Sequence, residues 1–398
     1  MSEPQTGRTL NANSSGYDNV ASARELLQLI RSHADETERS RKLAPPVVAA
    51  LRSRGLLAMG LPAALGGLET PIGNALRAIE EIAYADGATG WNVMIAFDTG
   101  LQAGYLHAPT ARALISSIQR PIIAGTISPP GRLQRTAGGY RLTGRWSFGS
   151  GCQQADVFIL GAMVCEGDKP LVDTNGTPDM REVVVRAADV DILDTWHVAG
   201  LRGTGSHDFT VDNLFVADGF AEPMNFQVPS DPGPLYAFPI IASLAVAKGA
   251  VALGIARHAI EALKDLAQVK PIGPNSLLRE RPALQADVAR AEAHVRAGRA
   301  FLHEVVDEAW QSVTKGDAVA PEQRALLRLA AVDTAHRARE AVDLMFNAGA
   351  TTAIYESSPL ERCFRDAHIV TAHVVVQYAV YEVTGGVLLN LPPGTPVW

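Results

Sequence analysis

The chain has 398 residues, 47% of them hydrophobic, which is enough to bury a large core and to form two or three domains. Its formal net charge is −7 and it has no dense run of Lys and Arg, so we expect no nucleic-acid partner. No apolar run approaches the ~20 residues that a membrane span requires, and we expect no membrane partner.

The cysteines point to a reducing compartment. Cys152, Cys165 and Cys363 are odd in number and lack the spacing of a metal site. This pattern is typical of free thiols in a cytoplasmic protein, and we expect no bound metal.

The chain begins with a polar segment. Residues 1–19 lack a signal-peptide core and are predicted to be a flexible N-terminal arm. Residues 20–120 are predicted to form a helical domain. Within it, Pro45-Pro46 opens a helix that Gly55 ends, because proline suits the first helical turn and glycine the position after the last.

Two further helices are predicted before residue 120. Thr70-Pro71 is predicted to supply the N-cap and the first position of one of them. The next, over residues 89–106, carries Phe97 and Asp98 in an apolar setting. A carboxylate such as Asp98 lies more often at a helix edge than in a site.

Residues 121–235 alternate in short apolar segments and are predicted to form a central antiparallel β domain. Its main feature is a hairpin over residues 124–151, whose turn is Gly138-Gly139. The period of two places Trp146 and Phe148 on one face. The small residues 125–131 allow a flat ligand to approach the backbone, although an ordinary hairpin has the same pattern.

Residues 236–398 return to helical periodicity. Helices are predicted over residues 255–269, 283–313, 322–346 and 365–391, rich in alanine and suited to close interhelix contact. The order helical, β, helical predicts an α+β protein.

Four local sequences in this order resemble the acyl-CoA dehydrogenase fold family. They are Gly125–Gly131 before a hairpin, Gly144-Arg145-Trp146 with its small-residue tail, residues 200–206 (GLRGTGS), and Pro359-Leu360-Glu361-Arg362 leading to Arg365-Asp366-Ala367. The resemblance covers nearly the whole chain. It implies a C-terminal four-helix bundle, a flavin between the β domain and the bundle, and a homotetramer, with Val374, Val375, Val376 and Val380 expected at subunit contacts.

The chain departs from the dehydrogenases where they carry a catalytic glutamate. His373-Val374 stands in that place, and Glu382 in Tyr381-Glu382-Val383-Thr384 lies more than two helical turns too late. Without a carboxylate base, removal of the proton α to a thioester carbonyl lacks its usual agent. The chain is therefore more similar to the flavin-dependent monooxygenases built on this fold.

That branch implies a two-component system. Its oxygenase receives reduced FAD or FMN from a separate NAD(P)H flavin reductase and reacts with O2 through a C4a-hydroperoxyflavin. The expected substrate is a small aromatic or polycyclic organic molecule. A dehydrogenase acting on an acyl thioester and a relative without catalysis stay open as alternatives.

The resemblance also carries over site residues. His373 is the expected catalytic group, able to hold a proton near neutral pH. His368, five residues earlier and about 140° around a helix, is expected to face elsewhere. Ser147 or Ser150 is expected to accept a hydrogen bond from the flavin N5–H, and Ser147 is counted with His373 as catalytic.

Weaker expectations cover the rest of the site. The expected flavin contacts are Thr126, Ser128, Trp146, Ser147, Ser150, Arg202, Thr204, Ser206, Arg279 and Gly349. The expected substrate pocket contains Phe97, Asp98, His207 and His373. Arg279 and the nearby Arg281 could equally be solvated surface residues with no role in binding. His207 could equally be a residue of a turn.

Overall fold

A computed structural model describes residues 18–394 of the chain. The predicted N-terminal arm lies outside the described residues except for Asp18 and Asn19, which begin the first helix. The N-terminal helices are α1 (Asn19–Glu25), α2 (Leu27–Ser32), α3 (Ala34–Ser40), α4 (Pro45–Ser53), α5 (Ile72–Ala85), α6 (Gly87–Ala103) and α7 (Pro109–Ser116).

The start of α5 differs from its prediction. The helix begins at Ile72, and Pro71 rather than Thr70 occupies the N-cap position. Thr70 is buried, and its hydroxyl accepts a hydrogen bond from the Asn19 side chain at 2.6 Å. The Thr70 hydroxyl, predicted to cap α5, is therefore hydrogen-bonded to Asn19 of α1 instead.

A single large sheet follows, in the strand order β6-β7-β2-β1-β3-β5-β8 with β4 on β3. Its strands are β1 (Ile123–Thr136), β2 (Gly139–Gly149), β3 (Val157–Glu166), β4 (Lys169–Pro170), β5 (Met180–Arg186), β6 (Asp191–Ile192), β7 (His207–Ala217) and β8 (Ala221–Pro223). The predicted hairpin is β1–β2, and Gly138 has the positive φ of 75° that its turn requires.

The sheet is mixed, which corrects the prediction of a purely antiparallel domain. β3 runs parallel to β1, with Ile123 opposite Val157, while the other strand pairs run antiparallel. The chain leaves β2 through a short 3-10 turn (Cys152–Gln154) and returns on the far side of β1. Alternation in a sequence shows which face of a strand is buried, but not which strand lies beside it.

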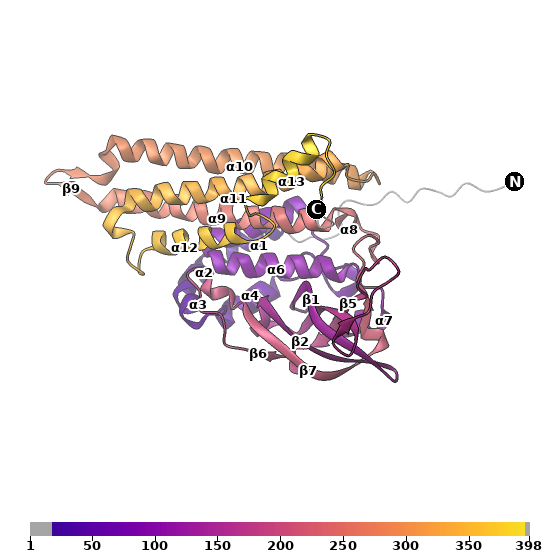
Figure 1. Cartoon of the computed structure of the whole chain (residues 1–398). Coiled ribbons are helices and arrows are strands. Elements are labelled where there is room, and N and C mark those ends of the chain that lie inside the picture. Colours follow the sequence, from indigo (N-terminus) through magenta and orange to yellow (C-terminus); the bar gives the residue numbers. More distant parts are fainter. Residues whose placement is uncertain (1–17, 395–398) are drawn as a thin grey trace.

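The C-terminal part is a bundle of long helices, which forms the upper layer in Figure 1. Its elements are α8 (Pro234–Ala237), α9 (Ile240–Val269), the small hairpin β9 (Pro271–Gly273) and β10 (Ser276–Leu277), α10 (Pro282–Thr314), α11 (Pro321–Gly349), α12 (Pro359–Ala372) and α13 (Ala379–Leu388). Helices α10, α11 and α12 each begin with proline in the first turn.

The expectation that no apolar run approaches the length of a membrane span is wrong for helix α9. It is long and apolar enough by composition, with a mean hydropathy of 1.7, and it is one such helix within residues 18–394. However, 83% of that stretch is buried inside the protein, where α9 packs against α5, α6, α10, α11 and α12. The central helix of a bundle needs no polar face.

The predicted last helix, residues 365–391, is two helices with a break between them. Helix α12 ends at Ala372, His373 is its C-cap with an extended ψ of 135°, and α13 starts at Ala379. Three consecutive valines follow His373, and β-branched residues weaken a helix. Val375, Val376 and Val380 are buried within the chain, so only Val374 of the four valines expected at subunit contacts is exposed.

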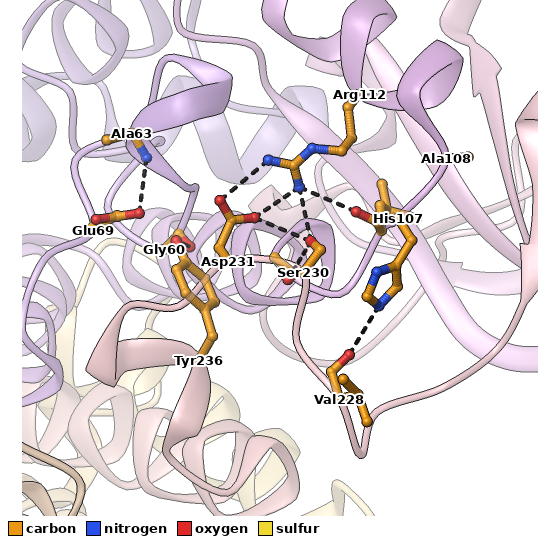
Figure 2. Close-up of polar contacts among 12 residues, drawn as sticks. Gly60, Ala63, Glu69, His107, Ala108, Arg112, Val228, Ser230, Asp231 and Tyr236 are labelled. Atoms are coloured by element: carbon orange, nitrogen blue, oxygen red, sulfur yellow. Dashed lines mark hydrogen bonds and ion pairs between the residues drawn. The ribbon is translucent and has the colours of Figure 1, made fainter. Parts of the chain in front are cut away.

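A linker joins the sheet to the bundle between β8 and α8, and Figure 2 shows how it is held. The Arg112 guanidinium on α7 donates two hydrogen bonds to the Asp231 carboxylate, at 2.7 and 3.2 Å, and one to the Ser230 hydroxyl at 2.8 Å. Beyond the linker, the Tyr236 hydroxyl donates to the Gly60 carbonyl at 3.2 Å. These bonds fix the bundle against the N-terminal helices.

Candidate active site

Helix α6 lies between the bundle and the sheet in Figure 1, in contact with α9, α12 and β1. Every residue of α6 is buried except Ile95, which is partly exposed. Trp91 and Asp98 are seven residues apart, which is nearly two full turns, so they share the face of Ile95. This face is the only stretch of α6 that reaches solvent, and the candidate site is built on it.

Four side chains on this side of the sheet form one hydrogen-bonded chain, which we call the hydroxyl relay: Trp91, Ser150, Ser206 and Thr204. The Trp91 indole N–H donates to Ser150 Oγ at 3.1 Å, and the hydroxyls of Ser150 and Ser206 are 2.6 Å apart. Ser206 and Thr204 are 2.7 Å apart, and Thr204 donates to the Leu201 carbonyl at 2.8 Å. All four residues are buried.

The relay has a direction. Each hydroxyl has one proton, and Thr204 uses its proton on a carbonyl, so Ser206 must donate to Thr204 and Ser150 must donate to Ser206. Ser150 therefore has no proton to give, and it keeps one lone pair beside the bond from Trp91. A group that only accepts fits the N5–H of a reduced flavin and does not fit the bare N5 of an oxidised one.

His373 closes the site from the bundle side. Its ring lies edge-on to Trp91 with ring centroids 5.6 Å apart. Its Nδ1 accepts a hydrogen bond from the Val375 backbone N–H at 3.3 Å, which assigns the proton of the neutral ring to Nε2. The break after α12 makes this arrangement possible, because the Val375 amide would be used inside a continuous helix.

The charge state of His373 differs from the expectation. Burial, aided by the positive charge of Lys248, lowers the pKa of its imidazole to about 3. The ring is therefore neutral near pH 7. The expectation that it holds a second proton near neutral pH is wrong. It can act through its Nε2–H as a hydrogen-bond donor.

An ion pair lies two turns along the same helix face. The Lys248 ammonium of α9 donates to the Asp98 carboxylate of α6, and both side chains are at least nine-tenths buried. Burial raises the pKa of Asp98 to about 6, against the opposing effect of Lys248. The expected pocket residue Asp98 therefore lies on the site face, with a partner that the sequence analysis did not identify.

Trp146 and Phe148 of the hairpin do not share one face as alternation predicts. Trp146 is fully buried in the sheet core, donates to the Gly161 carbonyl at 2.9 Å and stacks on Phe209, so it is not a flavin contact. Phe148 is 73% exposed and has a positive φ of 64°. The register shifts between Trp146 and Gly149, and this bulge turns Phe148 away from the face that alternation predicts.

Phe148 is thus an exposed aromatic ring two residues from Ser150, held in a backbone conformation that costs a non-glycine residue about 1 kcal/mol or more. Its ring meets Trp196 edge-on at 6.3 Å. We expect Phe148→Gly to lower the affinity for reduced flavin ~10-fold through lost stacking. The free energy of unfolding should change by less than about 1 kcal/mol, since glycine tolerates the backbone angle.

Anaerobic titration and denaturant unfolding measure the two effects of Phe148→Gly. The matched control is Phe215→Ala on β7, a half-exposed phenylalanine away from the relay. Equal flavin affinity in Phe148→Gly and the parent would remove this ring from the site.

Two expected pocket residues lie elsewhere. Phe97 is fully buried and points to the Gly60 side of α6, one residue and about 100° from Asp98. His207 is buried at the start of β7, where its Nδ1 accepts hydrogen bonds from the Thr195 and Trp196 backbone N–H groups, both at 3.2 Å. Neither residue belongs to the pocket: Phe97 is core, and His207 holds a loop.

The glycine-rich loop at residues 200–206 is packed against protein on both sides. A Cβ on Gly200 would lie 2.5 Å from the Arg365 carbonyl oxygen, and one on Gly203 would lie 2.3 Å from Thr37. Arg202 donates to the Val198 carbonyl at 3.0 Å and pairs with Glu38 at 3.5 Å. The loop therefore positions Thr204 and Ser206 for the relay, and Arg202 is already engaged within the protein.

The remaining hairpin candidates are accessible. Thr126 is partly exposed, and its Oγ1 accepts from the Ser128 backbone N–H at 3.3 Å in an irregular stretch of β1. Ser128 and Ser147 are exposed, with Ser147 on the side of β2 opposite to Trp146. Their hydroxyls are free to meet a ligand, but they are not part of the relay.

Arg279 lies in the short 3-10 turn that follows β10, and the Gly349 carbonyl accepts a hydrogen bond from Lys270, the residue before β9, at 3.0 Å. Figure 1 shows β9 at one end of the bundle. Exposed Arg279 donates to Gln268. A Cβ on Gly349 would lie 2.8 Å from Leu360, so this glycine serves close helix contact. Their expected role as flavin contacts stays a prediction.

The two cavities described next are lined by residues outside the candidate site. Two cavities of about 250 and 290 Å³ lie elsewhere, one beside Phe220 and one beside His258 and Arg362. Trp91 and Lys248 were missed by the sequence analysis. A signal for Lys248 existed, because it is the one charged residue in the apolar run 240–256.

Comparison with known proteins gives a consistent result. The family model "Acyl-CoA dehydrogenase, N-terminal domain" matches residues 20–110, and "Acyl-CoA dehydrogenase, C-terminal domain" matches residues 246–378. The chain is 32% identical over 367 residues to an indole-3-acetate monooxygenase of Pseudomonas putida, covering 91% of each chain. It is 28% identical to the oxygenase component of an FADH2-dependent resorcinol hydroxylase of a Rhizobium species, covering 92% of each.

A comparison with solved structures gives the same family. The crystal structure of 3-HSA hydroxylase from Rhodococcus sp. RHA1 superposes with a TM-score of 0.86 at 25% identity, covering 97% of this chain and 100% of the other.

Proposed function

Because the chain belongs to the acyl-CoA dehydrogenase family, as a flavin-dependent monooxygenase, we propose that it is the oxygenase component that inserts one atom of O2 into a small aromatic molecule. The observation that carries the site assignment is the directed hydroxyl relay, which leaves Ser150 only as an acceptor. Reduced flavin activates O2 and delivers one oxygen atom to the substrate while the other leaves as water.

The residues of this chain have separate tasks in that reaction. Ser150 would accept a hydrogen bond from the N5–H of a bound reduced flavin and would so hold this edge of the ring in the site. Neutral His373 donates its Nε2–H to an oxygen at the same edge, held in orientation by the Val375 amide and the Trp91 ring. The buried setting of Trp91 and the relay excludes water from the reacting atoms.

The structure gives no support to a relocated dehydrogenase base. Glu382 is exposed on α13, beyond the break that follows His373. Val374 is the residue next to His373, and it carries no carboxylate. The α-proton of a thioester would therefore find no glutamate at this position.

Cofactor handling tests the proposal. An oxygenase component takes reduced flavin from a separate reductase, so the purified protein is expected to be nearly colourless and to bind reduced flavin at least ~10-fold more tightly than oxidised flavin, about 1.4 kcal/mol for one matched hydrogen bond. Anaerobic and aerobic titrations with FAD and FMN give both affinities. Stoichiometric oxidised FAD that survives gel filtration would contradict the proposal.

Assembly is a further part of the proposal. Exposed apolar side chains gather beyond His373, namely Val374, Tyr378, Leu388, Leu389 and Leu391. Apolar surface of this kind is typical of a contact between subunits. We expect a homotetramer by light scattering at micromolar concentration and a smaller species for Leu389→Glu. A monomeric parent protein would contradict this expectation.

A further inference from the structure

The direction of the hydroxyl relay depends on one backbone carbonyl, that of Leu201. This oxygen accepts hydrogen bonds from the Thr204 hydroxyl at 2.8 Å and from the Trp196 indole N–H at 3.2 Å. Leu201 has a positive φ of 50°, in the left-handed region that is unfavourable for residues other than glycine. A contact from outside the loop is therefore needed to keep this carbonyl in place.

Asp366 on α12 supplies that contact. Its Oδ1 accepts a hydrogen bond from the Leu201 backbone N–H at 2.6 Å, and both residues are buried. The preceding residue of α12, Arg365, donates to the Ala199 carbonyl at 2.6 Å, and its own carbonyl lies against Gly200. The glycine-rich loop is thus docked on α12, and Asp366 makes the contact nearest to the relay.

The Asp366 carboxylate is held for a backbone amide and not for a cation. Within residues 18–394 it forms no ion pair, whereas the neighbouring Arg365 pairs with Glu38 and Glu361. Burial raises the pKa of Asp366 to about 7, and the negative charges of Asp86 and Glu38 act in the same direction. The residue also lines the cavity of about 290 Å³, a polar space with room for water. A buried carboxylate without a cation is unfavourable, which points to a specific task for its oxygen.

Helix α12 connects the two halves of the candidate site. His373 is its C-cap, seven residues and about 10 Å after Asp366. The relay loop and the imidazole are therefore attached to one rigid element, and the Asp366 contact fixes the position of one relative to the other.

We propose that Asp366 is the positioning residue that sets the direction of the relay, by holding the Leu201 carbonyl where it accepts the Thr204 proton. This inference rests on the proposed function, because the direction acts on a bound flavin. With the carbonyl in place, Ser206 donates to Thr204, and Ser150 donates to Ser206 and is left as an acceptor. Without the carbonyl, Thr204 can donate to Ser206 and the order of donors reverses. Ser150 then becomes a donor, which fits the bare N5 of an oxidised flavin.

The test compares the affinities of Asp366→Leu for reduced and oxidised FAD, by anaerobic and aerobic titration of the full-length protein. We expect the preference for reduced FAD to fall ~10-fold, the factor that corresponds to one matched hydrogen bond. Part of this fall should come from tighter binding of oxidised FAD. A disturbance of packing alone would weaken both forms and leave their ratio unchanged. Asp366→Asn should keep the parent's ratio, since its amide oxygen can still accept from the Leu201 N–H.

A second variant, Thr204→Val, tests the same step even if Asp366→Leu does not fold. It removes the last hydroxyl of the relay, so the ratio should again fall ~10-fold. Combining the two changes should lower the ratio no further than either change alone, because both act on one chain of hydrogen bonds.

The matched control is Glu182→Leu on β5. Glu182 is a buried carboxylate whose pKa is also raised by burial to about 7, and it accepts a hydrogen bond from Gln102 at 2.6 Å. It has no bond to the relay or its loop, so this variant should keep the parent's ratio.

An unchanged ratio in folded Asp366→Leu, or in Thr204→Val, would overturn the inference and leave the proposed function standing, since the parent protein alone tests that function. An equal fall in Asp366→Asn would show that charge matters and not the acceptor oxygen, and a fall in Glu182→Leu would show that any buried carboxylate has this effect. Either result contradicts the assigned role. A parent protein that binds both forms of FAD equally would contradict the inference and the proposed function together.

Discussion

Replacing His373 with Asn is expected to lower substrate oxygenation by ~10² or more, the usual scale for removing a positioned proton donor. Hydrogen peroxide should be released instead, and the affinity for reduced flavin should stay within a few fold of the parent's. The Val375 amide and the Trp91 ring orient the imidazole. We expect its Nε2–H to act on oxygen transfer and not on flavin binding. Product and peroxide yields in single turnovers measure the two outcomes.

The pH profile distinguishes a neutral donor from an imidazolium. Burial lowers the pKa of His373 to about 3, so its protonation does not change between pH 6 and pH 9. Oxygenation in this range should show no step that disappears in His373→Asn. A step near pH 6.5 belonging to His373 would mean that the ring is more open to water than the structure indicates.

The control for this prediction is His368→Ala. His368 lies on α12 with its Nδ1 2.8 Å from the Phe364 carbonyl oxygen and its Nε2 3.5 Å from Asp343 on α11. It faces the neighbouring helix and not the relay, so we expect oxygenation within a few fold of the parent's. Similar losses in both variants would show that disturbance of α12, and not the His373 ring, causes the effect.

The second large effect concerns stability. Asp98→Ala is expected to lower the free energy of unfolding by about 3–5 kcal/mol at pH 7.5, because it leaves the Lys248 ammonium buried without its partner. The double variant Asp98→Leu/Lys248→Met should be as stable as the parent or slightly more stable, since apolar groups avoid the desolvation cost. Denaturant unfolding followed by circular dichroism measures the differences. A double variant as unstable as Asp98→Ala would contradict the buried-charge explanation.

The pH dependence of this pair has a defined sign. Folding raises the pKa of Asp98 from 3.8 to about 6, so ionisation of this group opposes folding. Its contribution to stability is fully present below about pH 4 and is lost as the pH rises through 6. The difference in stability between the parent and Asp98→Asn should therefore change between pH 4 and pH 6 and be level above about pH 7.

Much of the fold follows from local patterns in the sequence. The order helical, β, helical, the Gly138 turn and the proline start of α4 are visible without coordinates, since each depends on a few neighbouring residues. The loss of the dehydrogenase glutamate at His373-Val374 is also a local fact, and it led to the monooxygenases that the comparisons with relatives support.

The tertiary structure decided the parts of the site that depend on distant partners. A bulge sends Phe148 outward and Trp146 into the core, whereas alternation places them on one face. The relay joins Trp91 to Ser150 across 59 positions of sequence and Ser150 to Ser206 across 56, and Asp98 meets Lys248 across 150. Local propensity carries no information about such contacts, because burial and hydrogen-bond partners are properties of the folded chain.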